Sequence, residues 1–174
     1  MDDDNPYAPP ISDLIVIDEK PGKDPLADRG ARLVATILDG ILGMAYGLTI
    51  MYLLGIWSYA IQGKNPPFSL VLIATVPSFL CFLLIHGYFL KKNGQTIGKK
   101  LLGIRISDLE GNVPSFGKII LLRYLPVSLV PLIPLVGSYL SLIDMFFIFR
   151  SDRRCLHDLI AGTKVVVAKS NAHA

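Results

Sequence analysis

The chain has 174 residues and a formal net charge of +3, and 52% of its residues are hydrophobic while only 18% are charged. Its mean hydropathy of +0.51 is high for a soluble domain, and two cysteines are too few for a disulfide framework. Long apolar runs decide the class: they predict an all-α integral membrane protein of one compact domain, with no nucleic-acid partner, cofactor or metal.

Residues 1–28 form a polar N-terminal segment that begins Met-Asp-Asp-Asp and contains several prolines. A secretory signal peptide needs a basic start before its apolar core, so this segment does not resemble one. Its composition predicts a disordered cytoplasmic tail with one short strand at residues 14–17. The predicted membrane domain covers residues 29–168, and residues 169–174 form a second disordered tail.

Two long apolar runs predict the first two membrane spans, at residues 33–54 and 68–90. The first holds roughly 22 residues, about 33 Å as a helix, which is long enough to cross a bilayer. It carries one carboxylate, Asp39, and an ionisable group inside a span is a functional-site hypothesis by default. The second run contains Pro77, which predicts a kink, and His86 near its far end.

A polar connector follows at residues 91–118, and its basic residues are expected to lie against anionic lipid headgroups. Residues 104–107 alternate between apolar and polar side chains, and residues 164–167 near the C-terminus begin an apolar run that suits a second short strand. Alternation of this kind is typical of strands that are buried on one face. The two segments are therefore predicted to pair as a small cytoplasmic β-sheet.

The last apolar segment, residues 115–149, is interrupted by Pro126, Pro131, Pro134 and Gly137. It fits either one tilted span after a surface helix or a helical hairpin that enters the membrane and returns. The 17 Lys and Arg residues favour the hairpin, because only the link at residues 55–67 is poor in positive charge. Both termini and the connector are then cytoplasmic, in a multi-pass protein of the plasma membrane.

This topology places four ionisable groups at similar depth, if a helix rises about 1.5 Å per residue. Measured from the cytoplasmic end of their segments, Asp39, His86, Arg123 and Asp144 lie about 7–12 Å deep. Arg32 lies at the start of the first span, and its side chain is expected to extend toward the headgroups rather than toward Asp39. Since isolated buried charges are costly, we expect a cluster in which Arg123 neutralises Asp39, Asp144 or both.

Three motifs resemble, in the right order, those of the RDD family, which is named for one arginine and two aspartates. They are Arg32-Leu-Val-Ala-Thr-Ile-Leu-Asp39, Gly94-Gln-Thr-Ile-Gly-Lys-Lys-Leu-Leu-Gly-Ile-Arg-Ile106, and Leu156-His-Asp-Leu-Ile-Ala-Gly-Thr163. The resemblance covers roughly residues 27–168 and leaves out the N-terminal tail. It implies a small multi-pass membrane protein, a class for which transport, including sodium–proton exchange, is often suggested.

The resemblance also assigns roles to single residues. Arg32 and Asp39 match the family's arginine and first aspartate, and the second aspartate is Asp158 or Asp144, with Asp158 preferred. The candidate transport or ion-pair cluster is therefore Arg32, Asp39, His86, Arg123, Asp144 and Asp158.

Two functions fit this cluster. One is a sodium- or proton-type transporter or permease component, which with so few spans would need to form a homo-oligomer. The other is a membrane scaffold or assembly factor, in which the arginines and aspartates only hold the fold together. The pair His157-Asp158 invites a catalytic interpretation, but the chain has three histidines and lacks a Ser-His-acid or Cys/His pattern of recognisable spacing, so no enzymatic activity is predicted.

Overall fold

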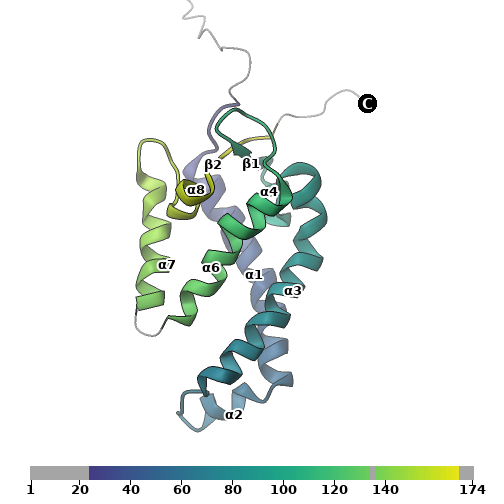
Figure 1. Ribbon diagram of the computed structural model, residues 1–174, viewed down its shortest axis with the longest axis vertical. Coiled ribbons are helices and arrows are strands. Elements are labelled where there is room, and N and C mark those ends of the chain that lie inside the picture. The colour runs from purple at the N-terminus through teal and green to yellow at the C-terminus, as the bar shows by residue number, and fades with distance from the viewer. Residues whose placement is uncertain (1–23, 134–135, 169–174) are drawn as a thin grey trace, which may run out of the picture.

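The structure is a computed structural model that describes residues 24–133 and 136–168 (Figure 1). The strand expected at residues 14–17 lies outside these described residues. The elements, in chain order, are α1 (Arg29–Leu53), α2 (Ile56–Ile61), α3 (Phe68–Asn93), α4 (Ile97–Leu101), β1 (Ile104–Asp108), α5 (Phe116–Lys118), the π-helix η1 (Ile119–Tyr124), α6 (Leu125–Leu129), the 3₁₀ turn η2 (Val130–Leu132), α7 (Val136–Phe146), the 3₁₀ turn η3 (Phe147–Phe149), α8 (Leu156–Ala161) and β2 (Thr163–Val167).

The two long helices, α1 and α3, coincide with the two predicted spans and pack against each other (Figure 1). Both are long and apolar enough to cross a membrane. Few of their side chains are buried, and large apolar side chains such as Ile41, Met44 and Leu84 are more than half exposed. An apolar helix whose surface is mostly uncovered matches a lipid environment better than water.

The third apolar segment forms a helical hairpin, as the distribution of positive charge predicts. Figure 1 shows the chain running away from the sheet through α6 and coming back toward it through α7. The descending arm contains the π-helix η1, a wider turn that the sequence did not indicate. Single π-turns in longer helices are rare and occur frequently at functional sites.

The two strands pair antiparallel, from Ile104 opposite Val167 to Asp108 opposite Thr163, which confirms the predicted sheet. Leu26 bridges to Val166, and the amide of Ala27 donates to the carbonyl of Val165 at 3.0 Å. The residues just before α1 are therefore tied to the last strand of the chain.

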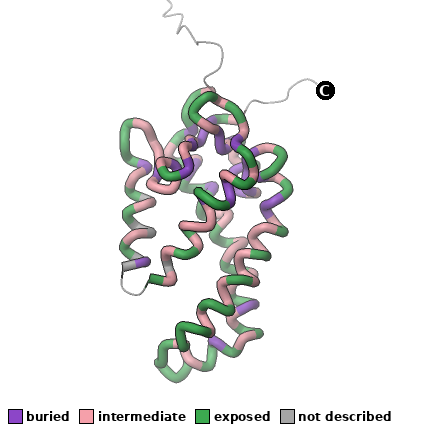
Figure 2. Tube along the Cα trace, in the orientation of Figure 1, coloured by how far each residue is buried: buried purple, intermediate pink, exposed green. Residues whose placement is uncertain are grey.

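Burial is uneven along the molecule. Figure 2 shows the buried positions gathered at the end that carries the sheet, where α4, α8 and the start of α1 also lie. One apolar cluster there joins Leu90 of α3, Ile106 of β1 and Ile119 of η1. This end is a small packed core, and it is the part of the structure that holds the charged groups in place.

Candidate functional site

Asp158 lies in the first turn of α8, whose N-terminus is capped by Cys155. The backbone amide of Cys155 donates to the carboxylate of Asp158 at 3.2 Å, which fixes its rotamer. The side chain of Asp158 is completely buried, although it follows the last apolar segment rather than lying within it. An ionised carboxylate in such a place requires charged or hydrogen-bonding partners.

Two arginines supply those partners. Arg32 Nη2, at the start of α1, donates to Asp158 Oδ2 at 2.7 Å, and Arg123 Nη1, in η1, donates to Asp158 Oδ1. The hydroxyl of Thr163, in β2, donates to Asp158 Oδ1 at 3.1 Å. Burial alone would raise the pKa of Asp158, but the charges of Arg123 and Arg32 outweigh it and hold the pKa well below its usual range.

We call Arg32, Arg123, Asp158 and Thr163 the Asp158 cluster. It corrects the expectation that Arg123 neutralises Asp39 or Asp144, because Arg123 pairs with Asp158 instead. The position of a residue along its own helix predicts its depth in the membrane. It does not predict which other element packs beside that residue. Here α8 packs against η1, and its residue Asp158 therefore lies beside Arg123.

Asp39 has different partners, all of them in the connector. Its Oδ1 accepts from the amide of Gly98 at 2.8 Å, and its Oδ2 accepts from the hydroxyl of Thr96 at 2.5 Å. The ammonium of Lys99 lies 3.6 Å from Oδ2. We call Asp39, Thr96, Gly98 and Lys99 the Asp39 site. Lys99 is only 8% exposed, so this lysine turns inward rather than toward headgroups as expected.

The short helix α4 is held at this position by His86. The amide of Ile97 donates to His86 Nδ1 at 3.2 Å, and the imidazole is 1% exposed and packs on Phe82. His86 therefore lies in the predicted layer, where it orients the first turn of α4. In that turn the amide of Gly98 donates to Asp39, while the amide of Lys99 donates to the hydroxyl of Thr96.

Gly98 permits the close approach of α4 to α1. A Cβ atom at this position would lie 2.3 Å from the backbone carbonyl oxygen of Ala35, which cannot move without shifting α1. Gly98→Ala is therefore expected to lower the free energy of unfolding by about 3 kcal/mol, at the upper end of the range for overpacking. Thermal unfolding of the purified protein measures this change.

Gly40→Ala is the matched control for that prediction, because no atom lies within 4 Å of a Cβ built at Gly40. Alanine stabilises the interior of a helix relative to glycine, so this variant should unfold at the same temperature as wild type or slightly above. Equal stability of Gly98→Ala and Gly40→Ala would contradict the close packing of α4 on α1.

Asp144 pairs with His157 rather than with an arginine. His157 Nδ1 lies 2.7 Å from Asp144 Oδ2, and the backbone amide of His157 donates to Asp144 Oδ1 at 2.9 Å. Burial, followed by the nearby charge of Arg123, lowers the pKa of His157 below its ordinary value. The pair therefore joins α7 to α8 through a hydrogen bond to a neutral imidazole at neutral pH.

The charges of the candidate residues balance. Arg32, Arg123 and Lys99 contribute three positive charges, and Asp39, Asp144 and Asp158 contribute three negative ones. The three carboxylates differ in accessibility, since the side chain of Asp158 is 0% exposed while those of Asp39 and Asp144 are 16% and 21% exposed. The sequence predicted one layer that holds Asp39 and Asp144 but not Asp158, and the structure shows one sealed carboxylate, that of Asp158, and two accessible ones.

A cavity of about 330 Å³ gives access to these groups, and we call it the polar cavity. Its lining includes Arg32, Thr36, Asp39, Thr96, Lys99 and Asp144. Asp158 is not in the lining, because the two arginines cover it.

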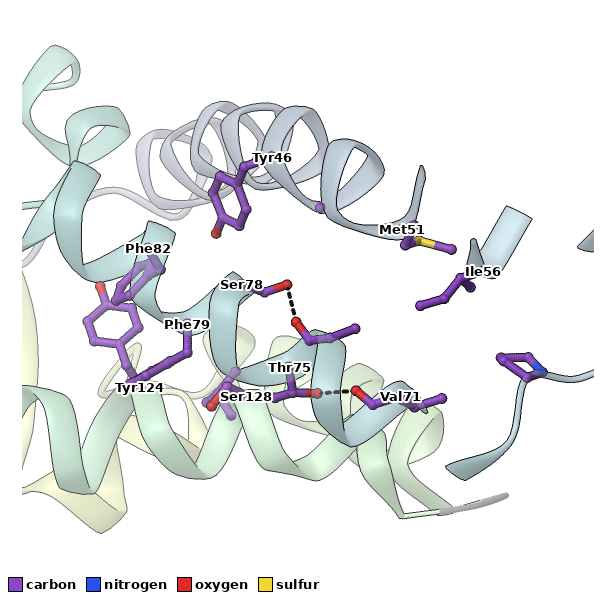
Figure 3. A pocket seen from close by; sticks show the side chains of 14 residues that line it. Tyr46, Met51, Ile56, Val71, Thr75, Ser78, Phe79, Phe82, Tyr124 and Ser128 are labelled. Carbon is purple, nitrogen blue, oxygen red and sulfur yellow. Dashed lines mark hydrogen bonds between the residues drawn. The ribbon is translucent and has the colours of Figure 1, made fainter. Parts of the chain in front are cut away.

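A second cavity of about 470 Å³ lies between α1, α3 and α6, and we call it the apolar cavity (Figure 3). The two cavities meet at Phe82, Tyr124 and Val127, which line both. The rings of Phe82 and Tyr124 stand 4.8 Å apart at this junction.

Cys155, His157 and Asp158 offer ligand atoms within 4.8 Å of one another, a spacing that a metal ion could bridge. The site does not suit one. Two guanidinium charges already occupy Asp158 and would repel a cation. Burial also raises the pKa of the Cys155 thiol to about 11, whereas metal ligation requires the thiolate.

Sequence reasoning missed the contributions of Thr96, Gly98, Lys99 and Thr163. Thr96 had a usable signal, because threonine is a preferred cap before a short helix and here its side chain accepts from the amide of Lys99. Gly98 and Thr163 fall within the two later motifs that resemble the family, but their contacts could not be predicted, since these depend on which segment of the fold lies beside them.

Comparison with known proteins adds a family and two relatives. The model of the RDD family matches residues 26–162. An "Uncharacterized protein" of Haemophilus influenzae is 30% identical over 149 residues, which cover 84% of this chain and 81% of the relative. The Bacillus subtilis "Uncharacterized protein YckC" is 34% identical over 141 residues, covering 79% and 82% respectively. No solved structure matches the chain significantly.

Proposed function

This chain belongs to the RDD family, and on that premise we propose that it is an ion-coupled membrane permease that binds a sodium ion or a proton at Asp39. The observation that carries the proposal is the difference between the carboxylates. Asp158 is sealed by two arginines, whereas Asp39 lines a cavity and has a lysine only at 3.6 Å. One aspartate holds the fold, which leaves the other free to exchange a ligand.

The surroundings of Asp39 suit a small cation. Sodium, like other hard cations, prefers oxygen ligands, and the hydroxyl groups of Thr36 and Thr96 line the same cavity as the carboxylate. Lys99 can leave the carboxylate when a cation arrives, because a long lysine side chain readily extends toward water or headgroups. In this proposal the carboxylate of Asp39 alternates between Lys99 and the transported cation, and this exchange is the step that couples ion binding to transport.

The proposal includes an orientation. The packed end with its sheet lies in the cytoplasm, with the N-terminal segment and the C-terminus on the same side, and α2 lies outside. The 17 Lys and Arg residues support it, since 15 of them fall in the segments assigned to the cytoplasm: four in residues 1–32, six in 91–118 and five in 150–174.

A reporter enzyme fused after Ala174 measures this orientation. It is expected to be active only in the cytoplasm, because Arg150, Arg153 and Arg154 resist transfer across the membrane. A reporter placed in the link at residues 62–66 serves as the opposite control and should be active only outside. Activity of the C-terminal fusion on the outer side would contradict the hairpin topology.

Purified protein in liposomes tests the permease itself. A sodium gradient across the liposome membrane is expected to drive a pH change inside, reported by an encapsulated dye, and empty liposomes should show none. If folded protein moves neither sodium nor protons, the ion-coupled function is wrong. Since two spans and a hairpin make a short pathway, activity is expected from a homo-oligomer rather than a single chain.

One observation favours a second candidate function, a membrane scaffold. The basic residues Lys91, Lys92 and Lys100 are exposed beside the packed end, where they would meet anionic headgroups or an acidic partner. All the ionised groups of the Asp158 cluster are paired, as a purely structural core requires. If the folded protein shows no ion flux in liposomes, the scaffold function is favoured over the permease function.

A further inference from the structure

We infer that the apolar cavity binds the hydrocarbon chain of a single-chain amphiphile, whose uncharged polar end hydrogen-bonds to the hydroxyl of Tyr124. This site goes beyond the ion site at Asp39 and does not depend on ion transport. Its volume of about 470 Å³ falls within the roughly 300–1,000 Å³ typical of small-molecule sites. Figure 3 shows the side chains that surround it.

The lining of the apolar cavity excludes a bare ion as its occupant. None of the fourteen lining residues carries a formal charge. Its serine and threonine hydroxyl groups donate to their own helices: Thr75 to the carbonyl of Val71 at 2.9 Å, Ser78 to that of Ala74 at 2.8 Å, and Ser128 to that of Leu125 at 2.8 Å. An occupant therefore gains mainly by burying apolar surface.

One polar group at the inner end of the cavity has no partner. The hydroxyl oxygen of Tyr124 is buried and makes no hydrogen bond within the described residues. Leaving such a group unpaired costs about 1–3 kcal/mol, so a ligand that satisfies it gains correspondingly. Figure 3 places Tyr124 beside Phe82 and Phe79 at one end of the cavity.

The position of Tyr124 determines where the polar end of the ligand lies. Tyr124 and Phe82 lie where the apolar cavity meets the polar cavity. A hydrocarbon chain bound in the apolar cavity therefore directs its polar head toward the polar cavity. The head is uncharged, because the three positive and three negative groups around the polar cavity already balance and an added charge would have no counterion. An alcohol or ester head meets both requirements.

The bilayer is the source of such a ligand. The cavity lies between α1 and α3, the two helices that are long and apolar enough to span a membrane. A monoacylglycerol has one chain, hydroxyl groups for Tyr124 and no charge. Headless alkanes would fill the cavity without satisfying Tyr124, and fatty acids would bring an unpaired carboxylate.

Photocrosslinking in nanodiscs tests the inference, with a monoacylglycerol that carries a diazirine in its chain. Gly47 lines the cavity and a Cβ there would meet no atom within 4 Å, so Gly47→Leu fills the cavity without a clash in the backbone. Gly40→Leu makes the same exchange on the same helix, also in open space but outside the cavity. Crosslinking to α1, α3 and α6 should fall at least ten-fold in Gly47→Leu and stay unchanged in Gly40→Leu.

Tyr124→Phe tests the polar contact separately. It should weaken crosslinking of the monoacylglycerol about five-fold, the effect of one lost hydrogen bond, and leave a headless diazirine alkane unaffected. If Gly47→Leu folds poorly, Ala74→Leu blocks the cavity from α3 and gives the same comparison. Equal crosslinking of wild type and a folded cavity-filling variant, or a stronger signal from a fatty-acid probe, overturns the inference.

Failure of this site and failure of the permease give different results. Crosslinking in a protein that moves no ions removes the ion-coupled function and leaves the amphiphile site in place. Ion flux in a protein that gives no cavity-dependent crosslinking does the reverse.

Discussion

Asp158→Asn is expected to lower the free energy of unfolding by about 3–5 kcal/mol, the usual effect of removing one member of a buried ion pair. The amide would leave the guanidinium groups of Arg32 and Arg123 buried side by side without a negative charge. For a chain of this size, that change corresponds to a fall of roughly 6–20 °C in the melting temperature in detergent. Low yield and loss of monodisperse protein would accompany it.

Asp152→Asn is the control for this variant, because the Asp152 pair with Arg150 is partly exposed and such pairs contribute little. Adding Arg123→Gln to Asp158→Asn should restore part of the stability by removing one unpaired charge.

Since the pKa of Asp158 is lowered on folding, its contribution to the free energy of unfolding is complete above the unfolded pKa of about 3.9 and is lost only in stronger acid. Wild-type stability from this group should therefore be constant between pH 5 and 8. An Asp158→Asn protein as stable as wild type would contradict the cluster.

Asp39→Asn is expected to abolish sodium- or proton-coupled flux while the protein stays folded. An amide neither titrates near neutral pH nor attracts a cation, so the proposed site would lose its ligand. The hydrogen bonds survive, because the amide oxygen can still accept from the Gly98 amide and the amide nitrogen can donate to the Thr96 hydroxyl. Liposomal flux and thermal unfolding are measured on the same preparation.

Lys99 decides how large the stability change of Asp39→Asn will be. The variant leaves this lysine without a carboxylate, and its long side chain can extend to the headgroups, so a decrease of only about 1 kcal/mol is expected. Lys99→Met in the same background should recover that decrease without restoring flux. A stable Asp39→Asn protein with unchanged flux would exclude Asp39 from transport and favour the scaffold function.

The two long apolar helices, the hairpin and the sheet could be predicted from the sequence because they depend on local signals. Apolar runs predicted both long helices to within about four residues at each end, alternation at residues 104–107 and an apolar run near the C-terminus indicated the paired strands, and the distribution of lysine and arginine favoured the hairpin. These features follow from composition along the chain, and no contact between distant segments has to be known.

The partners of the charged residues could not be predicted in the same way. Arg123 was expected to pair with Asp39 or Asp144 because they share its depth, but α8 turns back and places Asp158 beside it. Lys99 was expected at the headgroups, but α4 docks on α1 through Gly98 and turns the lysine inward. The depth of a charged residue can be read from its own helix. Its ion-pair partner depends on which other element packs against that helix, and this requires the tertiary structure.

The pairing of Arg32 with Asp158 has a consequence for biosynthesis. The two residues are 126 positions apart, so at about 5–20 residues per second the ribosome makes Arg32 roughly 6–25 s before its partner. Both long helices are synthesised and can insert during that interval, while the arginine has no carboxylate of α8 to bind. A chain that stops before α8 therefore lacks the carboxylate that neutralises Arg32 and Arg123, so the packed core is completed only once α8 has been made.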